Sequence, residues 1–252
     1  LLTSEGQVVL TRARRINAEL EAMRDDVASM SSHVTGKVSL GIIGATGRWL
    51  LPALLDDLSN QYPDVEVRVI DSTTTALIPL LETGDIDLAV INTPLTHDEL
   101  TTSPLFEEEL VVVTPSSHPL ASEGDRTVDF QELQKHKLLL GPRGSNLRDL
   151  IDTAARHQGV NLSTLAELDG IRLAATLAFQ GYAPAIVPVT AIPAWALRGE
   201  WRVLNIESIP PRLVGLAIRR RGMLSPAGNA MRDALRAAVR FQAPSIEGLI
   251  AI

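Results

Sequence analysis

The stretch VSLGIIGATG, Val38–Gly47, joins a short β-rich run to a turn that contains two glycines. A helical pattern of apolar residues follows over 49–58, and a second strand pattern runs over Val65–Ile70. The alternation continues with a helix over Ala76–Glu82 and a buried strand over Leu88–Ile91. This order of strand, helix, strand, helix and strand predicts a parallel sheet with helices on its faces.

The second half of the chain repeats the alternation. We expect strands over Glu109–Thr114, Lys137–Leu140, Leu162–Glu167 and Ala185–Pro188, and helices over Phe130–His136, Leu147–His157 and Ile171–Gln180. A later strand over Val214–Arg219 and an amphipathic helix from Ser225 to Phe241 have no sheet of their own to join, so we expect them to return to the first sheet. The expected division therefore has three parts: a linker over 1–36, subdomain I over 37–107 and 214–252, and subdomain II over 108–213.

The N-terminal segment carries a heptad pattern. Its apolar residues are spaced alternately by four and three positions, which is typical of a coiled-coil seam: Val9, Ala13, Ile16, Leu20, Met23, Val27 and Met30. An ordinary amphipathic helix packed on its own domain also places apolar residues on one face. The polar break that follows, Ser31-Ser32-His33, favours a helix outside the domain that joins it to a second copy or to another domain.

The composition excludes several classes of protein. The 252 residues include no cysteine, which rules out disulfides, thiolate metal sites and cysteine nucleophiles. No apolar run approaches the ~20 residues that span a bilayer, and the first residues have no signal-peptide core, so we expect a cytoplasmic protein. A formal net charge of −7 argues against a nucleic-acid surface on this chain. Because the chain begins with Leu1, we expect it to be a piece of a longer protein.

Several short segments occur in a recognisable order. They are Leu2-Thr3-Ser4-Glu5-Gly6, Leu51-Pro52, Tyr62-Pro63-Asp64-Val65, Gly84-Asp85-Ile86-Asp87-Leu88-Ala89, the run from Pro104 to Val113, and Ser117-His118-Pro119-Leu120-Ala121. This order resembles the LysR-type transcriptional regulators of bacteria, without most of their N-terminal DNA-binding domain. The resemblance implies two doubly wound α/β subdomains of the periplasmic-binding-protein type, joined by two crossover strands, with an effector cleft between them. It also implies a homodimer or homotetramer that binds a small-molecule effector and reaches DNA through the missing domain, with no catalytic residues, metal or cofactor.

Turns that follow the strands supply the candidate effector site. Open α/β sheets bind ligands at the carboxyl ends of their strands, and helix N-termini present free N–H groups to anions. The candidate residues are Gly44, Ala45, Thr46, Gly47, Thr73, Thr74, Asn92, Arg143, Ser145, Asn146 and Pro188. The resemblance aligns Thr74 and Ala45 with effector-contacting positions of the family. Thr74 and Ser145 also suit helix N-caps or turns, as threonine and serine often do.

Two features near this site depart from the family pattern. A serine or threonine usually stands near positions 43–45, whereas here only Thr46 offers a hydroxyl. The segment Gly181-Tyr182-Ala183-Pro184 replaces the common Gly-Leu-Gly-Ile. We therefore expect a small polar or anionic effector that differs from the usual small carboxylates.

Charged residues in these regions have simpler interpretations. Arg143 and Arg148 flank the turn of the second subdomain and suit bidentate pairing with a carboxylate, but the position of Arg148 inside a helix favours a solvated surface charge. The acidic run Glu107–Glu109 alternates in direction along a strand start, so it cannot converge on a cation, and we interpret it as a solvated crossover.

Two other functions fit parts of the pattern. Gly41-x-x-Gly44-Ala45-Thr46-Gly47 after a strand, with Asp71 ending the next strand, resembles a dinucleotide-binding fingerprint for NAD(P). The Tyr-x-x-x-Lys pair of the dehydrogenases that use this turn is absent, because neither tyrosine is followed four residues later by lysine. A periplasmic-type solute-binding protein shares the expected fold, but it would carry a signal peptide where this chain has the heptad pattern.

Overall fold

The computed structural model describes residues 2–29, 33–121, 127–193 and 201–252. Contacts between residues divide the chain into two compact units. Unit 1 comprises 1–43, 47–105 and 214–243, and unit 2 comprises 44–46, 106–213 and 244–252. The chain therefore crosses from unit 1 to unit 2 after residue 105, returns to unit 1 at residue 214 and ends in unit 2. The subdomain boundaries expected from the sequence stay a prediction.

The first sheet has six strands in the described part of the chain. In spatial order they are β12 (Leu249–Ala251), β4 (Leu100–Glu108), β11 (Arg212–Arg219), β3 (Leu88–Thr93), β1 (Gly36–Ile43) and β2 (Val65–Ser72). β1 lies between β2 and β3 and is parallel to both, as the strand–helix alternation predicts. The late strand β11 lies in this sheet between β4 and β3.

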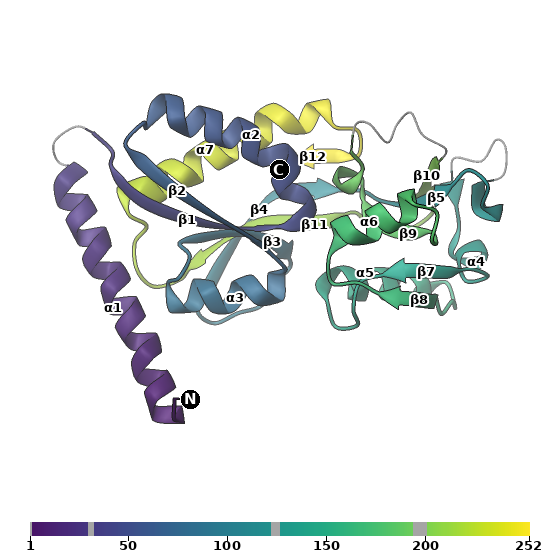
Figure 1. Cartoon of the computed structure of the whole chain (residues 1–252), viewed down its shortest axis with the longest axis horizontal. Helices are drawn as coiled ribbons and strands as arrows, with labels where there is room; N and C mark the ends of the chain where they lie inside the picture. The colour runs from purple at the N-terminus through teal and green to yellow at the C-terminus, as the bar shows by residue number, and fades with distance from the viewer. Residues whose placement is uncertain (1, 30–32, 122–126, 194–200) are drawn as a thin grey trace. The chain divides into compact units, whose positions relative to one another are not determined.

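Helices cover both faces of the parallel strands in unit 1. They are α2 (Gly44–Gln61), α3 (Thr74–Thr83) and α7 (Pro226–Gln242). Figure 1 shows α2 and α7 on one face and α3 on the other. Leu50 and Leu54 of α2, and Leu77 and Leu81 of α3, are completely buried. Burial on both faces is what a βαβ sequence requires, because each helix has one apolar side to cover.

The second sheet forms the centre of unit 2. In spatial order its strands are β6 (Thr127–Val128), β10 (Trp201–Ile206), β5 (Leu110–Pro115), β9 (Ala185–Pro188), β7 (Lys137–Leu140) and β8 (Ser163–Glu167). β5 is antiparallel to β10 and β9, whereas β7 is parallel to β8 and β9. The sheet is therefore mixed.

The central strand β5 divides its side chains between two apolar cores. Leu110 and Val112 pack with the helices α4 (Phe130–Leu133) and α5 (Asn146–His157), and Val111 and Val113 pack with α6 (Ile171–Phe179). Alternation along a strand explains the division, since successive side chains point to opposite faces. The short 3₁₀ turns complete the described elements: η1 (Pro119–Ala121), η2 (Val189–Ala191) and η4 (Ala243–Ser245).

The two α/β units and the order of strands and helices confirm the expected fold class. Four strands of the described residues were not expected, namely β4, β6, β10 and β12. The strand expected over Val65–Ile70 continues to Ser72, because Asp71 and Ser72 pair in register with Ile42 and Ile43. β12 pairs with the end of β4, so two segments that are far apart in sequence become neighbouring strands at the edge of the first sheet.

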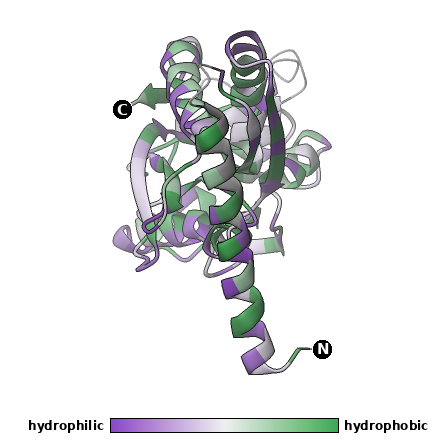
Figure 2. Ribbon diagram, turned by 90° about the vertical axis from the view of Figure 1, so that its left-hand side faces the viewer, coloured by the Kyte–Doolittle hydropathy of each residue, from purple (hydrophilic) through white to green (hydrophobic). Residues whose placement is uncertain are grey.

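The N-terminal helix α1 (Ser4–Ser29) is present, as the heptad pattern predicts. Its seam residues are exposed; the exposed fraction is 66% for Val9, 60% for Ile16 and 46% for Leu20. Figure 2 shows the apolar positions of this helix as green segments between hydrophilic ones. Met30, the last expected seam position, lies outside the described residues. The seam is thus an apolar strip open to a partner.

Gly215 on β11 occupies a position where the sheet admits no side chain. A Cβ there would lie 2.8 Å from the carbonyl oxygen of Ser103 and 2.9 Å from Cγ2 of Thr93. Since the backbone of β4 must move to make room, Gly215→Ala is expected to cost about 1–3 kcal/mol of unfolding free energy, measured by urea denaturation. Gly170→Ala is the control, because its Cβ would meet only Cβ of Leu173 at 3.7 Å. An equal loss in both variants would contradict this prediction.

Candidate functional site

The first two parallel strands end level with each other. Ile43, the last residue of β1, pairs with Ser72, the last residue of β2. Helix α2 begins at Gly44 directly after β1, and helix α3 begins at Thr74 after one linking residue, Thr73. Both helix N-termini therefore follow the same carboxyl edge of the sheet, which is where open α/β sheets bind ligands.

The first turn of α2 leaves its backbone donors without a side-chain cap. Gly44–Gly47, expected as a turn, form the first turn of the helix itself. Ile43 stands at the N-cap and makes no capping hydrogen bond, and the first turn contains no acidic residue. By contrast, Thr73 caps α3 and Ser145 caps α5. The N-terminal N–H groups and positive dipole end of α2 therefore suit an anion.

Thr46 in this turn carries a buried polar atom. Its side chain is 0% exposed, and its Oγ1 has no hydrogen-bond partner among the described residues. Buried hydroxyls are normally bonded, so this atom is of the kind that a ligand satisfies. Ala45 is buried in the core of unit 2. A Cβ at Gly47 would lie 3.4 Å from Cδ1 of Leu51, which is ordinary van der Waals contact, so packing does not require glycine at this position.

Thr73 and Thr74 have different roles at the start of α3. Thr73 is the N-cap, and its Oγ1 accepts a hydrogen bond from the N–H of Ala76 at 3.4 Å. Thr74 is buried, and its Oγ1 accepts the N–H of Asn92 at 3.1 Å. A hydroxyl that accepts one hydrogen bond still has a proton to donate. Thr74 thus links the start of α3 to the end of β3 and retains donor capacity.

In unit 2 a turn joins β7 to α5. Ser145 caps this helix, because its Oγ accepts the N–H of Arg148 at 3.4 Å, and Asn146 is the first helical residue. Gly144 has a φ of +82°, which favours glycine, and a Cβ there would meet nothing within 4 Å. Pro188 ends β9 and is buried in its sheet. Ser145 and Asn146 therefore share one turn with an open side, whereas Pro188 belongs to the interior.

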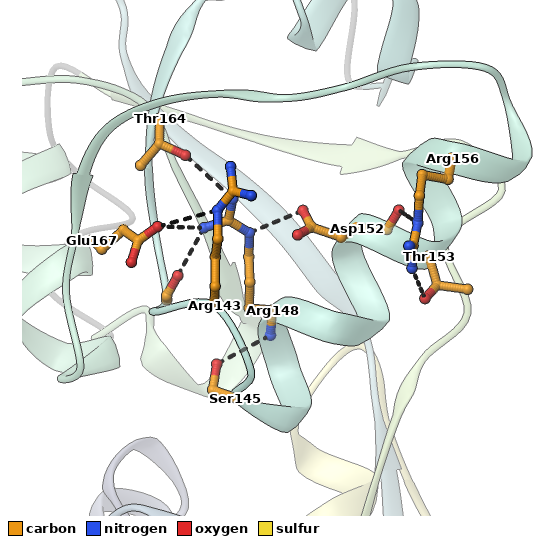
Figure 3. Close-up of polar contacts among 9 residues, drawn as sticks. Arg143, Ser145, Arg148, Asp152, Thr153, Arg156, Thr164 and Glu167 are labelled. Atoms are coloured by element: carbon orange, nitrogen blue, oxygen red, sulfur yellow. Dashed lines mark hydrogen bonds and ion pairs between the residues drawn. The ribbon is translucent and has the colours of Figure 1, made fainter.

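Arg148 corrects an expectation: it is not a solvated surface charge, because its side chain is only 1% exposed. Nε donates to Oδ1 of Asp152 at 2.9 Å, and Nη1 donates to the carbonyl oxygen of Gly141 at 2.9 Å. Nη2 donates to Oγ1 of Thr164 at 3.3 Å, and Oε1 of Glu167 lies 3.6 Å from Nη1. Figure 3 shows these groups converging on the guanidinium from both sides.

This network holds the turn that carries Ser145 and Asn146. Arg148 ties the first turn of α5 to the ends of β7 and β8, and its donors are directed at protein groups. It therefore positions the turn. Arg143 differs, since its side chain is 77% exposed and its Nε lies 3.6 Å from Oε1 of Glu167. Of these two arginines, Arg143 is the one that a dissolved anion can reach.

Glu108 is a second charged residue that lies inside the protein. It is 0% exposed; Oε1 accepts the backbone N–H of Thr190 at 2.9 Å and also the hydroxyl of that residue. Oε2 accepts Nε of Arg212 at 2.7 Å. The interpretation of the acidic run as a solvated crossover is therefore wrong for this residue. Strand alternation was the available signal, because it places Glu108 on the same face as buried Phe106 and Leu110.

The segment that resembles a dinucleotide fingerprint serves packing. A Cβ at Gly41 would lie 2.7 Å from Cδ1 of Ile86 and 2.8 Å from Cδ2 of Leu77, so this glycine lets α3 approach β1 closely. In the described part of the chain, no three or more His, Cys, Asp or Glu side chains are grouped to hold a metal ion. The same described residues contain no helix long and apolar enough to cross a bilayer.

Comparison with known proteins identifies the family. The family model described as the LysR substrate binding domain matches residues 31–240. The chain belongs to this family. The probable hydrogen peroxide-inducible genes activator of Mycobacterium leprae is 30% identical over 225 residues, covering 86% of this chain and 70% of that protein. The HTH-type transcriptional regulator CbbR of Xanthobacter flavus is 28% identical over 235 residues, covering 92% of this chain and 70% of its own.

Solved structures of LysR-type proteins have the same fold. The Corynebacterium glutamicum OxyR C206 mutant superimposes with a TM-score of 0.72 at 25% identity, covering 97% of this chain and 77% of that one. The effector-binding domain of QuiR in complex with shikimate superimposes with a TM-score of 0.73 at 25% identity, covering 84% of this chain and 99% of that one. The resemblance found in the sequence is therefore confirmed: this is the effector-binding domain of a LysR-type regulator, preceded by the helix α1.

Proposed function

We propose that this LysR-type domain binds a small polar or anionic metabolite at the carboxyl ends of its strands and reports it to a DNA-binding domain outside the 252 residues. The function is sensory, without catalysis, and is exercised in the cytoplasm. The polar contacts proposed for the effector come from Thr46, Thr73, Thr74 and Asn92 at the carboxyl edge of the first sheet. Arg143, Ser145 and Asn146 stay separate candidate residues of unit 2.

The uncapped start of α2 carries this proposal. It combines free backbone donors with the buried hydroxyl of Thr46, which has no partner among the described residues. Donors of this kind complement a carboxylate or another small anion. The donor capacity of Thr74 at the start of α3 adds to them. The similar QuiR domain is in complex with shikimate, a hydroxylated carboxylate. Hydroxylated carboxylates are therefore the first probes, and other small polar or anionic compounds follow, because the departures near Thr46 and Tyr182 predict an effector unlike the usual small carboxylates.

A thiol-based response to peroxide does not fit this chain. Several relatives are named hydrogen peroxide-inducible genes activators. Peroxide acts on proteins chiefly through cysteine thiolates, which it oxidises to sulfenic acids and disulfides. The 252 residues contain no cysteine, so cysteine oxidation is not available to them. The signal of this regulator is therefore proposed to be a bound metabolite.

Thr46→Val is expected to weaken effector binding roughly tenfold or more while leaving the unfolding free energy unchanged or slightly higher. The hydroxyl has no partner among the described residues, so a methyl group of similar size removes an unsatisfied buried group. A hydrogen bond to a charged ligand group contributes about 1.5–3 kcal/mol, and 1.4 kcal/mol is tenfold in affinity. A thermal-shift screen of hydroxylated carboxylates, beginning with shikimate, supplies the probe, and calorimetry compares the variant with the parent.

Thr114→Val is the matched control for this substitution. Thr114 lies on β5, is 0% exposed, and its Oγ1 also has no hydrogen-bond partner within the described ranges. Both variants are expected to be as stable as the parent, and only Thr46→Val should lose affinity. Equal affinities in the parent and Thr46→Val would place the effector elsewhere. A screen in which no small polar compound raises the melting temperature would reject the proposed effector class.

We also propose that the chain self-associates through the exposed seam of α1. Replacing Ile16 and Leu20 together by glutamate is expected to convert a dimer or tetramer into a monomer, because charges cannot be buried in an a/d seam without a large penalty. Sedimentation velocity at tens of micromolar measures the mass. Val8→Glu is the control, since Val8 is 61% exposed on the same helix but lies outside the seam. A monomeric parent, or an unchanged mass in the double variant, would disprove this mode of association.

A further inference from the structure

Helix α3 connects two places in unit 1 that the proposed function uses. Its ten residues begin at Thr74, whose Oγ1 accepts the N–H of Asn92 at 3.1 Å. Its other end closes at Gly84, which has a φ of +81° and donates its N–H to the carbonyl oxygen of Leu81. The start of α3 thus belongs to the candidate effector site. The other end of α3 contacts the N-terminal helix α1.

Arginines from other elements bind the carboxyl end of α3. The helix has no basic residue in its own last turn. Instead, Nε of Arg15 on α1 donates to the carbonyl oxygen of Glu82 at 2.7 Å, and Nη1 of Arg219 on β11 donates to that of Leu81 at 3.1 Å. Cations at a helix C-terminus are favourable because they complement the negative end of the dipole and bond to the unpaired carbonyls. The linker helix therefore supplies part of the cap of α3.

Two further ion pairs hold α1 to the segments beside this cap. Nη1 of Arg14 lies 3.0 Å from Oδ2 of Asp85, directly after the end of α3. Nη1 of Arg15 lies 3.3 Å from Oε2 of Glu99. The Arg15 side chain is only 28% exposed, so its bonds are partly shielded from water. Adjacent arginines of α1 thus bind the carboxyl end of α3 and its immediate surroundings.

The body of α3 is packed closely against the first sheet. Leu77 and Leu81 are completely buried, and Gly41 of β1 allows close approach of the helix to the sheet. Packed interiors transmit displacements, because they contain few voids that absorb them. A shift imposed at Thr74 therefore changes the position of the carbonyls that Arg15 binds.

We propose that α3 reports occupancy of the effector site at Thr74 to the linker helix α1, through Arg15 and Arg14. This inference rests on the proposed function, because it names the regulation of that same site. An effector that forms a hydrogen bond with the start of α3 favours one position of α3. Helix α1 responds because Arg15 and Arg14 bind the carboxyl end of α3 and the residue after it. Coupling of this kind is reciprocal, so a change at Arg15 must also alter the site around Thr74.

The reciprocity is testable in the 252-residue chain without any effector. Arg15→Gln removes the guanidinium that bonds to Glu82 and Glu99. The hydrogen bond from Asn92 to Thr74 is then expected to weaken, so that the amide of Asn92 exchanges with deuterium roughly two- to tenfold faster, the range expected for one hydrogen bond. Residue-resolved hydrogen exchange by NMR measures this rate. The converse variant, Thr74→Val, is expected to speed exchange of the Nε–H of Arg15.

Arg12→Gln is the matched control, because Arg12 is an exposed arginine of the same helix that makes no polar contact with the described residues. Faster exchange at Asn92 in Arg15→Gln, with the parent rate in Arg12→Gln, supports the proposal. An unchanged rate in Arg15→Gln, or the same acceleration in both variants, overturns it. The ligand screen is a separate measurement: a failed screen beside a positive exchange result would reject the effector and retain the mechanical coupling.

Discussion

Glu108→Ala is expected to lower the unfolding free energy by about 3–5 kcal/mol, because it leaves the guanidinium of Arg212 buried without its carboxylate. The side chains of Glu108 and Arg212 are 0% and 3% exposed, and Nη2 of Arg212 lies 2.5 Å from Oε2 of Glu108. The variant also removes the acceptor of the N–H of Thr190. Chemical denaturation in urea measures the loss through the midpoint and slope of the transition.

An exposed ion pair provides the control for this prediction. Nζ of Lys37 lies 2.9 Å from Oε2 of Glu66, but the two side chains are 77% and 68% exposed. Glu66→Ala is therefore expected to lower the unfolding free energy by at most about 1 kcal/mol. The double change Glu108→Leu with Arg212→Met is expected to recover part of the loss, because no unpaired charge remains inside. If Glu108→Ala lost no more stability than Glu66→Ala, the buried pair would not contribute as argued.

Local patterns in the sequence predicted the parallel half of the fold. The strands β1, β2 and β3 and the helices between them follow from apolar periodicity, because a parallel sheet is buried on both faces and each helix shows one apolar stripe. The strand β4 was missed. Its first part, Leu100–Pro104, is mostly polar and contains a proline. Its last residues, Phe106–Glu108, pair with β12, which lies more than a hundred positions further along the chain. A strand whose partner is remote in sequence leaves little local signal.

Residue type predicted part of the candidate site. Ser145 caps α5, as the preference of serine for this position suggests. The same interpretation is wrong for Thr74, because the neighbouring Thr73 caps α3 and Thr74 is the first helical residue. The buried, unpartnered hydroxyl of Thr46 was not predictable, since burial depends on what the rest of the chain packs around it. The burial of Arg148 has a local signal in the sequence. It precedes the buried Ile151 by three residues and Ala155 by seven, which places all three on one helical face.

Arg148→Met is expected to lower the unfolding free energy by about 2–4 kcal/mol. Methionine retains most of the apolar stem, but it leaves the carbonyl oxygen of Gly141 and the hydroxyl of Thr164 without their donor. The loss should be smaller than for Glu108→Ala, because the side chain of Asp152 is 31% exposed and regains water when its partner is removed. Urea denaturation measures the change, and hydrogen exchange at residues 145–149 is expected to accelerate as the turn loosens.

Arg156→Met is the matched control for Arg148→Met, since Arg156 lies two turns further along the same helix and also donates to protein oxygens. Its Nε donates to the carbonyl oxygen of Asp152 at 3.2 Å and its Nη2 to Oγ1 of Thr153 at 3.0 Å, both in exposed positions (Figure 3). Removing it is expected to cost at most about 0.5 kcal/mol, as for most surface substitutions. Equal losses for the two arginines would mean that Arg148 does not hold the turn. Arg148→Met could also lower the stability without faster hydrogen exchange at residues 145–149. In that case Arg148 would stabilise the core of unit 2 but would not position Ser145 and Asn146.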